Sequence, residues 1–265
     1  YATVFSGFYS ALMMLLFMLI FRAVAIEFRS KRPMRWWRQM WDVAFSVASI
    51  FIAFLAGVSV ANLITGVPLG PDKEFTGTFW SLINPYSILV GITTVALFMM
   101  HGAIYGVMKT EGDLHHKLRG WVNNTIIFFI ICYITTTMAT LIYYPHMIKH
   151  FKEVPALFIL AVLNMLAIAN IPREISKGKD FLAFLSSCAS IAALLSLFAF
   201  GVFPNFVLAS NNPEFSLNIY NAASSQKTLN IMLIIALIGI PFVLAYTISI
   251  YWIFRGKVKL NNMSY

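Results

Sequence analysis

The chain has 265 residues, of which 60% are hydrophobic and only 11% are charged. A soluble domain has about 25% charged residues, and the mean hydropathy here is +0.79. This composition excludes a soluble globular protein and predicts a single integral-membrane domain over residues 1–265. The net charge of +9 does not indicate nucleic-acid binding, because the basic residues gather in short segments between apolar runs.

Seven apolar runs are long enough to cross a bilayer, since a transmembrane helix needs about 20 mostly apolar residues. In chain order they cover about residues 4–28, 43–64, 87–108, 121–143, 155–171, 181–203 and 229–254. No strand-like alternation continues over any stretch, and a bilayer admits only helices and closed barrels as spanning elements. The sequence therefore predicts an all-α, polytopic bundle of transmembrane helices.

The distribution of Lys and Arg between the connecting segments predicts the orientation. Alternate segments hold fourteen basic residues: Arg29, Lys31, Arg32, Arg35, Arg38, Lys109, Lys117, Arg119, Arg173, Lys177, Lys179, Arg255, Lys257 and Lys259. The intervening loops hold four: Lys73, Lys149, Lys152 and Lys227. Basic residues concentrate on the cytoplasmic side, so we expect the Tyr1 end outside and the Tyr265 end inside. The two longer outer loops, 65–86 and 204–228, are expected to be ordered turns packed over the bundle.

Segment 21–42, which reads FRAVAIEFRSKRPMRWWRQMWD, joins the first two spans and holds charged groups near the membrane. Ionisable groups at membrane depth are costly and are candidates for a functional role. Arg22 lies near the cytoplasmic interface, where snorkelling is the structural alternative. Glu27 has the spacing to pair with Lys31 one turn later.

Asp42 lies in the first turn of the second span, where its charge complements the helix dipole. Arg22 and Asp42 lie at similar depth on consecutive antiparallel spans, so a desolvated pair between them is a sharper hypothesis. Breaking one side of such a buried pair costs about 3–5 kcal/mol. Trp36, Trp37 and Trp41 alternate with arginines, which is typical of an interfacial belt that attracts anionic membrane lipid.

The histidines and cysteines carry weaker signals. His101, inside the third span, could ligate a haem iron, but a lone membrane histidine more often hydrogen-bonds a neighbouring helix. His146 and His150 have the i, i+4 spacing of a metal pair, yet basic neighbours oppose a cation there, so no metal site is expected. Cys132 and Cys188 lie inside apolar runs and are expected to be free thiols. These features alone leave transporter, channel and respiratory subunit open.

Six segments, in order, resemble subunit II of the cytochrome bd-type quinol oxidases. They are YATVFSGFYSALMMLLFMLIFRAVAIEFRSK at 1–31, RWWRQMWD at 35–42, GVSVANLITGVPL at 57–69, FWSLINPYSILVG at 79–91, MKTEGDLHHKLR at 108–119 and NAASSQKTLNIM at 221–232. The family pattern has nine spans. The resemblance therefore implies a fragment that lacks two helices before Tyr1.

The resemblance implies a function in aerobic respiration at the bacterial plasma membrane. In this family the complex oxidises quinol and reduces dioxygen to water. Haem b and haem d belong to subunit I, and subunit II is its scaffold and lines part of a proton route. Some members hold a quinone in subunit II, and a small single-span accessory subunit is a further expected partner.

The resemblance also singles out residues. Charged positions of the family pattern fall on Arg22, Glu27, Arg29 and Asp42, for which it implies a role in assembly or a proton network. The SSQ before the last span falls on Ser224, Ser225 and Gln226, where Ser also suits a helix N-cap. The rival class is a secondary transporter, which predicts charged residues at span midpoints and broken helices. No span has a charge at its midpoint, which favours the subunit.

Overall fold

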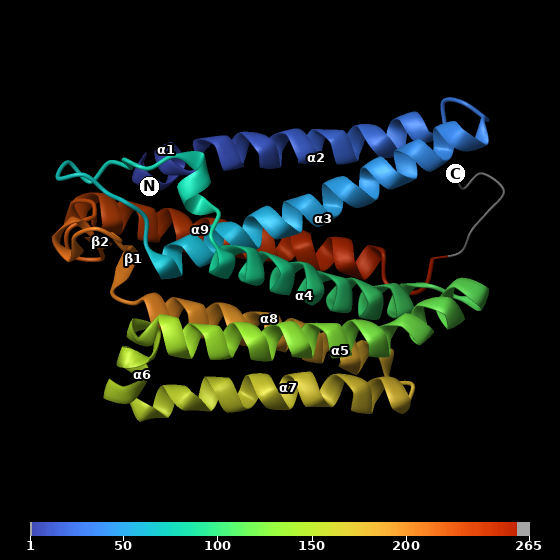
Figure 1. The fold of residues 1–265 in the computed structure, drawn as a ribbon. Coiled ribbons are helices and arrows are strands. Elements are labelled where there is room, and N and C mark those ends of the chain that lie inside the picture. The colour runs from blue at the N-terminus through green and yellow to red at the C-terminus, as the bar shows by residue number, and fades with distance from the viewer. Residues whose placement is uncertain (1, 259–265) are drawn as a thin grey trace.

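A computed structural model describes residues 2–258 (Figure 1). Its long helices are α2 (Tyr9–Arg29), α3 (Arg35–Thr65), α4 (Pro85–Lys109), α5 (Gly112–Tyr143), α7 (Phe158–Ser176), α8 (Asp180–Val202) and α9 (Gln226–Ile253). Its short helices are α1 (Ala2–Gly7), α6 (Lys149–Glu153) and the 3-10 turns η1 (Phe79–Leu82), η2 (Pro145–Ile148), η3 (Pro155–Leu157) and η4 (Pro213–Phe215). Seven helices in this part of the chain are long and apolar enough to span a membrane. The predicted all-α polytopic bundle is confirmed.

Two helices begin well before the predicted spans. α3 begins at Arg35 rather than residue 43, and α5 begins at Gly112 rather than residue 121. Their first turns are polar, so hydropathy alone excludes them from the span. The backbone hydrogen bonds of a helix continue past the apolar slab, however, because water and headgroups solvate polar side chains there. Likewise, α7 continues through Pro172 to Ser176.

The helices pack in a chain of neighbours. α2 packs on α3, α3 on α4, α4 on both α5 and α8, and α7 on α8. Figure 1 shows the α2–α3 and α4–α5 turns at one end of the bundle, whereas α1, α6 and the strands lie at the other. The predicted basic and outer segments therefore lie at opposite ends of the molecule.

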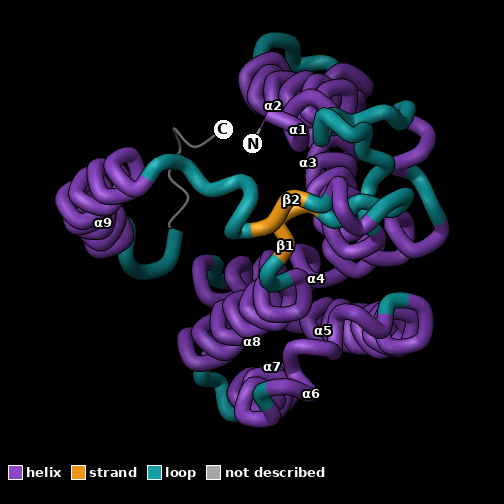
Figure 2. Tube along the Cα trace, turned by 90° about the vertical axis from the view of Figure 1, so that its left-hand side faces the viewer, coloured by secondary structure: helices purple, strands orange, loops and turns teal. Residues whose placement is uncertain are grey.

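Helix α9 lies apart from the other long helices (Figure 2) and has no buried residue. Just after the C-terminal end of α9, the carbonyl oxygens of Phe254 and Gly256 accept hydrogen bonds from the Lys109 Nζ, at 2.7 Å and 3.2 Å. The Val258 backbone N–H also donates to the Lys109 carbonyl at 2.8 Å. These bonds tie the end of α9 to the end of α4, while its apolar length remains without side-chain cover from the described part of this chain.

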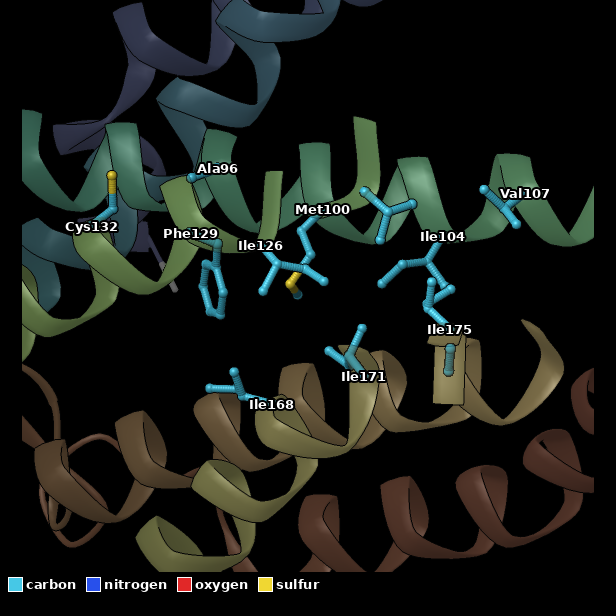
Figure 3. Close-up of a cluster of buried hydrophobic side chains, with 12 residues drawn as sticks. Ala96, Met100, Ile104, Val107, Ile126, Phe129, Cys132, Ile168, Ile171 and Ile175 are labelled. Atoms are coloured by element: carbon cyan, nitrogen blue, oxygen red, sulfur yellow. The ribbon is translucent and has the colours of Figure 1, made fainter. Parts of the chain in front are cut away.

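The main core lies between α4, α5, α7 and α8. Figure 3 shows Met100 and Ile104 of α4, Ile126 and Phe129 of α5 and Ile171 of α7 gathered in one buried cluster. All five side chains are at most 4% exposed. Because lipid is as apolar as these side chains, close van der Waals packing, rather than escape from water, holds such helices together.

The contact between α3 and α4 depends on glycine. A Cβ built on Gly57 would lie 2.8 Å from both the Gly91 Cα and the Val90 carbonyl oxygen. Real Cβ atoms do not approach backbone atoms that closely. Small residues at helix interfaces let backbones approach each other, so Gly57 sets the distance between these two helices.

The two longer loops form an ordered cap at the end opposite the α2–α3 turn. Strands β1 (Asn205–Val207) and β2 (Leu217–Asn218) pair antiparallel within the second loop. Val67, Leu69 and Val207 are buried together with Phe8 of the N-terminal segment. The Asn211 Nδ2 donates to the Leu69 carbonyl at 2.7 Å and joins the two loops. The expectation that these loops pack over the bundle is confirmed.

Candidate functional site

The α2–α3 hairpin holds the charged residues that the sequence singles out. α2 ends at Arg29 and α3 begins at Arg35. The Trp37 Nε1–H donates to the Phe28 carbonyl at 2.8 Å, a bond that bridges the two helices beside the turn. The hairpin therefore has a defined shape, and its charged side chains project from two packed helices.

Asp42 pairs with Arg29, not with Arg22. The Arg29 Nε donates to Asp42 Oδ1 at 2.6 Å and its Nη2 donates to Oδ2 at 3.3 Å, a two-point contact. The two side chains are 43% and 52% exposed, so the hypothesis of a desolvated Arg22–Asp42 pair is wrong. The guanidinium of Arg22 lies instead over the Phe45 ring, 5.0 Å from its centroid, one turn further along α3.

The pair expected from helical spacing is present. The Lys31 Nζ lies 2.8 Å from Glu27 Oε1 across one turn. Both side chains are more than half exposed, and exposed ion pairs contribute little to stability. Electrostatically, the hairpin thus neutralises Glu27 and Asp42 internally with two of its basic residues.

Aromatic rings fill the space between the two helices. Trp41 packs against Phe21, Phe28 and Trp37, with ring centroids 5.5 to 5.9 Å apart. Its Nε1–H is buried and has no acceptor among the residues that the structure describes. Beside it lies a small pocket of about 170 Å³, lined by Ala25, Ile26, Arg29, Trp41, Asp42 and Phe45. The pocket lining is mostly apolar and includes the Arg29–Asp42 pair.

His101 makes a hydrogen bond to a neighbouring helix. Its Nδ1 lies 2.9 Å from the Ser187 Oγ of α8, and its ring packs at 5.1 Å against Phe184. These contacts place His101 in the packing of α4 against α8, as expected of a lone membrane histidine. The His146 Nε2 lies 3.0 Å from the Ile64 carbonyl, and His150 pairs with Glu153. Residues 2–258 contain no cluster of three metal-ligating side chains.

The core contains a network of hydrogen-bonded polar side chains whose pairing was not predicted from the sequence. The Ser190 hydroxyl donates to the Asn164 Oδ1 at 2.8 Å, and the Asn164 Nδ2 donates to the Tyr133 hydroxyl at 3.0 Å. Asn164 and Ser190 are fully buried, and the network joins α5, α7 and α8. The sequence pointed to this network only through Asn164, a polar residue inside an apolar run. Its partners lie 26 and 31 residues away in sequence, so they could not be identified from the local pattern.

The serine motif lies at the start of α9. Ser225 is the N-cap, and its hydroxyl accepts from the Thr228 backbone N–H at 3.4 Å. Gln226 begins the helix, and its Nε2 donates to the Asn230 side chain at 3.1 Å. Ser224 precedes the cap. This geometry accounts for Ser225 by local helix capping.

Cys132 and Cys188 are free thiols in α5 and α8, as expected.

The structure places the charged candidates on the α2–α3 hairpin, whereas the polar core network lies on other helices that are distant in sequence. No single cluster joins all of the predicted residues in the described chain.

Comparisons with known proteins place the chain in a family. The family model described as cytochrome bd terminal oxidase subunit II matches residues 1–254. The chain is 28% identical to the "Cytochrome bd-I ubiquinol oxidase subunit 2" of Escherichia coli (strain K12), over 99% of this chain and 77% of that relative. It is 30% identical to the "Cytochrome bd ubiquinol oxidase subunit 2" of Bacillus subtilis (strain 168), over 98% of this chain and 76% of that relative. It is also 30% identical to the "Probable cytochrome oxidase subunit 2" of Haemophilus influenzae, over 98% and 77%. The chain belongs to the cytochrome bd terminal oxidase subunit II family.

Proposed function

We propose that this chain is the second subunit of a membrane quinol oxidase, a complex that oxidises quinol and reduces dioxygen to water in aerobic respiration. The observation that carries the proposal is the family match over residues 1–254. The names of the relatives from E. coli and B. subtilis add ubiquinol as the class of electron donor. This match supports a subunit role over the alternative of a secondary transporter.

The redox centres are assigned to the partner subunit. We propose that haem b and haem d are held there, as the resemblance to the family implies, while His101 of this chain contacts Ser187 and Phe184 of a neighbouring helix. The present chain then acts as a scaffold, with a bound quinone and a small single-span accessory subunit as further proposed components. The tightly packed core between α4, α5, α7 and α8 supports a structural role.

The charged hairpin is proposed to contribute to assembly or to a proton network at the cytoplasmic face. Arg22, Glu27, Arg29 and Asp42 lie on a surface that this chain leaves at least partly exposed. Two of the four form the Arg29–Asp42 contact, whereas the Arg22 guanidinium lies over the Phe45 ring. Such side chains are available to a neighbouring subunit or to water.

Co-purification tests the proposal. The chain, in its full-length context with a C-terminal tag, is expressed together with its neighbouring large membrane subunit and purified by the tag. We expect the large subunit to co-purify, with b- and d-type haem bands in the reduced-minus-oxidised spectrum. A tagged chain that purifies alone and without haem would contradict the proposal and would favour the transporter class.

A further inference from the structure

The α2–α3 hairpin carries more positive charge than this chain neutralises. Lys31 and Arg29 face Glu27 and Asp42, whereas Arg32, Arg35 and Arg38 form no ion pair and no side-chain hydrogen bond with any residue that the structure describes. All three are exposed. An arginine carries five N–H donors in a fixed fork that suits carboxylate or phosphate oxygens. The hairpin therefore presents several donors that no described residue of this chain matches.

The position of these arginines makes internal neutralisation difficult. Arg35 and Arg38 lie in the first turn of α3, which contains no acidic residue and has no side-chain cap at Met34. Cations at a helix N-terminus are opposed by the helix dipole. An external anion would offset this repulsion, so charge complementarity favours an anionic occupant for the hairpin surface.

Deeper in the membrane, the same hairpin places a cation next to an apolar pocket, which is the combination that an amphiphilic ligand requires. Arg22 lies seven residues before Arg29 along α2, about 10 Å deeper at 1.5 Å per residue. Its guanidinium lies over the Phe45 ring, and Phe45 also lines the apolar pocket of about 170 Å³ to which Arg29 and Asp42 contribute. Trp36, in the first turn of α3, is 58% exposed, as expected for an indole at the headgroup level.

We propose that the α2–α3 hairpin is a specific binding site for an anionic phospholipid. The headgroup phosphate is held by the arginines of the turn and of the first turn of α3, and an acyl chain lies along the apolar pocket that Ala25, Ile26 and Phe45 line. A carboxylate of a partner protein could also satisfy arginines. The combination of a basic turn, an exposed indole and an apolar pocket at successive depths matches the layered chemistry of a phospholipid better.

Lipid binding to the purified complex tests this inference without reference to haem content or oxidase activity. Native mass spectrometry gives the affinity of the delipidated complex for phosphatidylglycerol, with zwitterionic phosphatidylcholine for comparison. The variants are Arg35→Gln, Arg38→Gln and Arg22→Gln. Lys117→Gln is the matched control, because Lys117 is another exposed cation at the same end of the bundle and lies 5.5 Å from the Trp121 ring centroid.

We expect the unaltered complex to prefer phosphatidylglycerol. Each Arg→Gln change should weaken that binding about fivefold, while Lys117→Gln should leave it within about twofold. The preference should also fall as salt rises, because exposed charges are screened. Arg35 and Arg38 project from the surface, so their variants keep the test valid if Arg22→Gln prevents assembly. Equal affinity of the unaltered complex for the two lipids would overturn the inference. So would a loss of phosphatidylglycerol affinity in Lys117→Gln as large as in the Arg→Gln variants.

Discussion

At the scale of single residues, the ion pairs of the hairpin show how exposure to solvent lowers the cost of losing one partner of an ion pair. Asp42 accepts two hydrogen bonds from Arg29, but both side chains are about half exposed. Water solvates either partner when the other is removed. The large penalty of an orphaned buried charge therefore does not apply here.

Asp42→Asn is consequently expected to lower the thermal stability of the purified complex only slightly. Arg29→Gln should have the same effect, and the double variant should be no worse than either single change, because each change removes the same contact. Thermal unfolding of the complex in detergent measures all three. A large loss of stability in Asp42→Asn that the double variant relieves would contradict this and would indicate a desolvated pair in the assembly.

The buried polar network is expected to matter more to stability. Asn164→Leu removes bonds to Ser190 and Tyr133 between three helices, each bond contributing about 0.6 kcal/mol in a membrane protein. We expect a loss of about 1–2 kcal/mol once the orphaned Ser190 hydroxyl is included. Asn170→Leu is the control, since Asn170 is only half-buried and makes one bond, to Ser186. Equal stability of the two variants in the same unfolding assay would contradict the importance of the network.

Residue partners were the least predictable part of the site. The Glu27–Lys31 pair follows from spacing within one helix and could be predicted. The Arg29–Asp42 pair depends on how two helices cross and on which way a long side chain turns, and neither is encoded in the local pattern. For the same reason Asn164 was visible as a polar residue in an apolar run, but its partners on two other helices were not.

At the scale of helices, close packing at Gly57 makes a sharp prediction. Gly57→Ala places a methyl group against the α4 backbone, so α3 and α4 must separate. Overpacking of this kind costs about 1–3 kcal/mol. The matched control is Gly102→Ala in α4, because a Cβ on Gly102 would meet nothing within 4 Å.

The comparison of Gly57→Ala with Gly102→Ala measures contact rather than helix propensity, since both changes replace a helical glycine by alanine. We expect the first variant to melt at a lower temperature and the second to remain unchanged or to gain slightly. Two variants of equal stability would contradict the close approach of α3 and α4 at Gly57.

The helices themselves were predictable because apolar length is a direct requirement of the bilayer. All seven spans were placed, and the ends of α4, α8 and α9 agree within three residues of the predicted ranges. The starts of α3 and α5 were missed by eight and nine residues, since polar turns beyond the apolar slab carry no hydropathy signal. The short β1–β2 pair was not predicted either, because strands of two or three residues show no alternation.

At the scale of the whole molecule, the predicted orientation in the membrane rests on charge asymmetry and can be tested directly. Ser210 lies exposed in the cap and Lys117 is exposed at the opposite end. With the native thiols inside α5 and α8, Ser210→Cys and Lys117→Cys each add one accessible thiol. A membrane-impermeant maleimide should label Ser210→Cys in intact spheroplasts, and Lys117→Cys only after the membrane is opened. The reverse pattern would contradict the proposed orientation.

The separation of α9 also belongs to this scale. Helix α9 has no buried residue, and Lys109 of α4 ties its C-terminal end to the bundle. Its apolar surface thus faces lipid or other protein, which agrees with a chain that belongs to a family of oxidase subunits.

The most direct test of the subunit account is quinol-driven oxygen consumption in membranes of a host that lacks every other terminal oxidase. The full-length chain is deleted while its large partner is still expressed, and the rate is measured with and without the chain restored. Quinol-driven oxygen consumption should be lost on deletion and should return with the restored chain. An undiminished rate in membranes without the chain would contradict it.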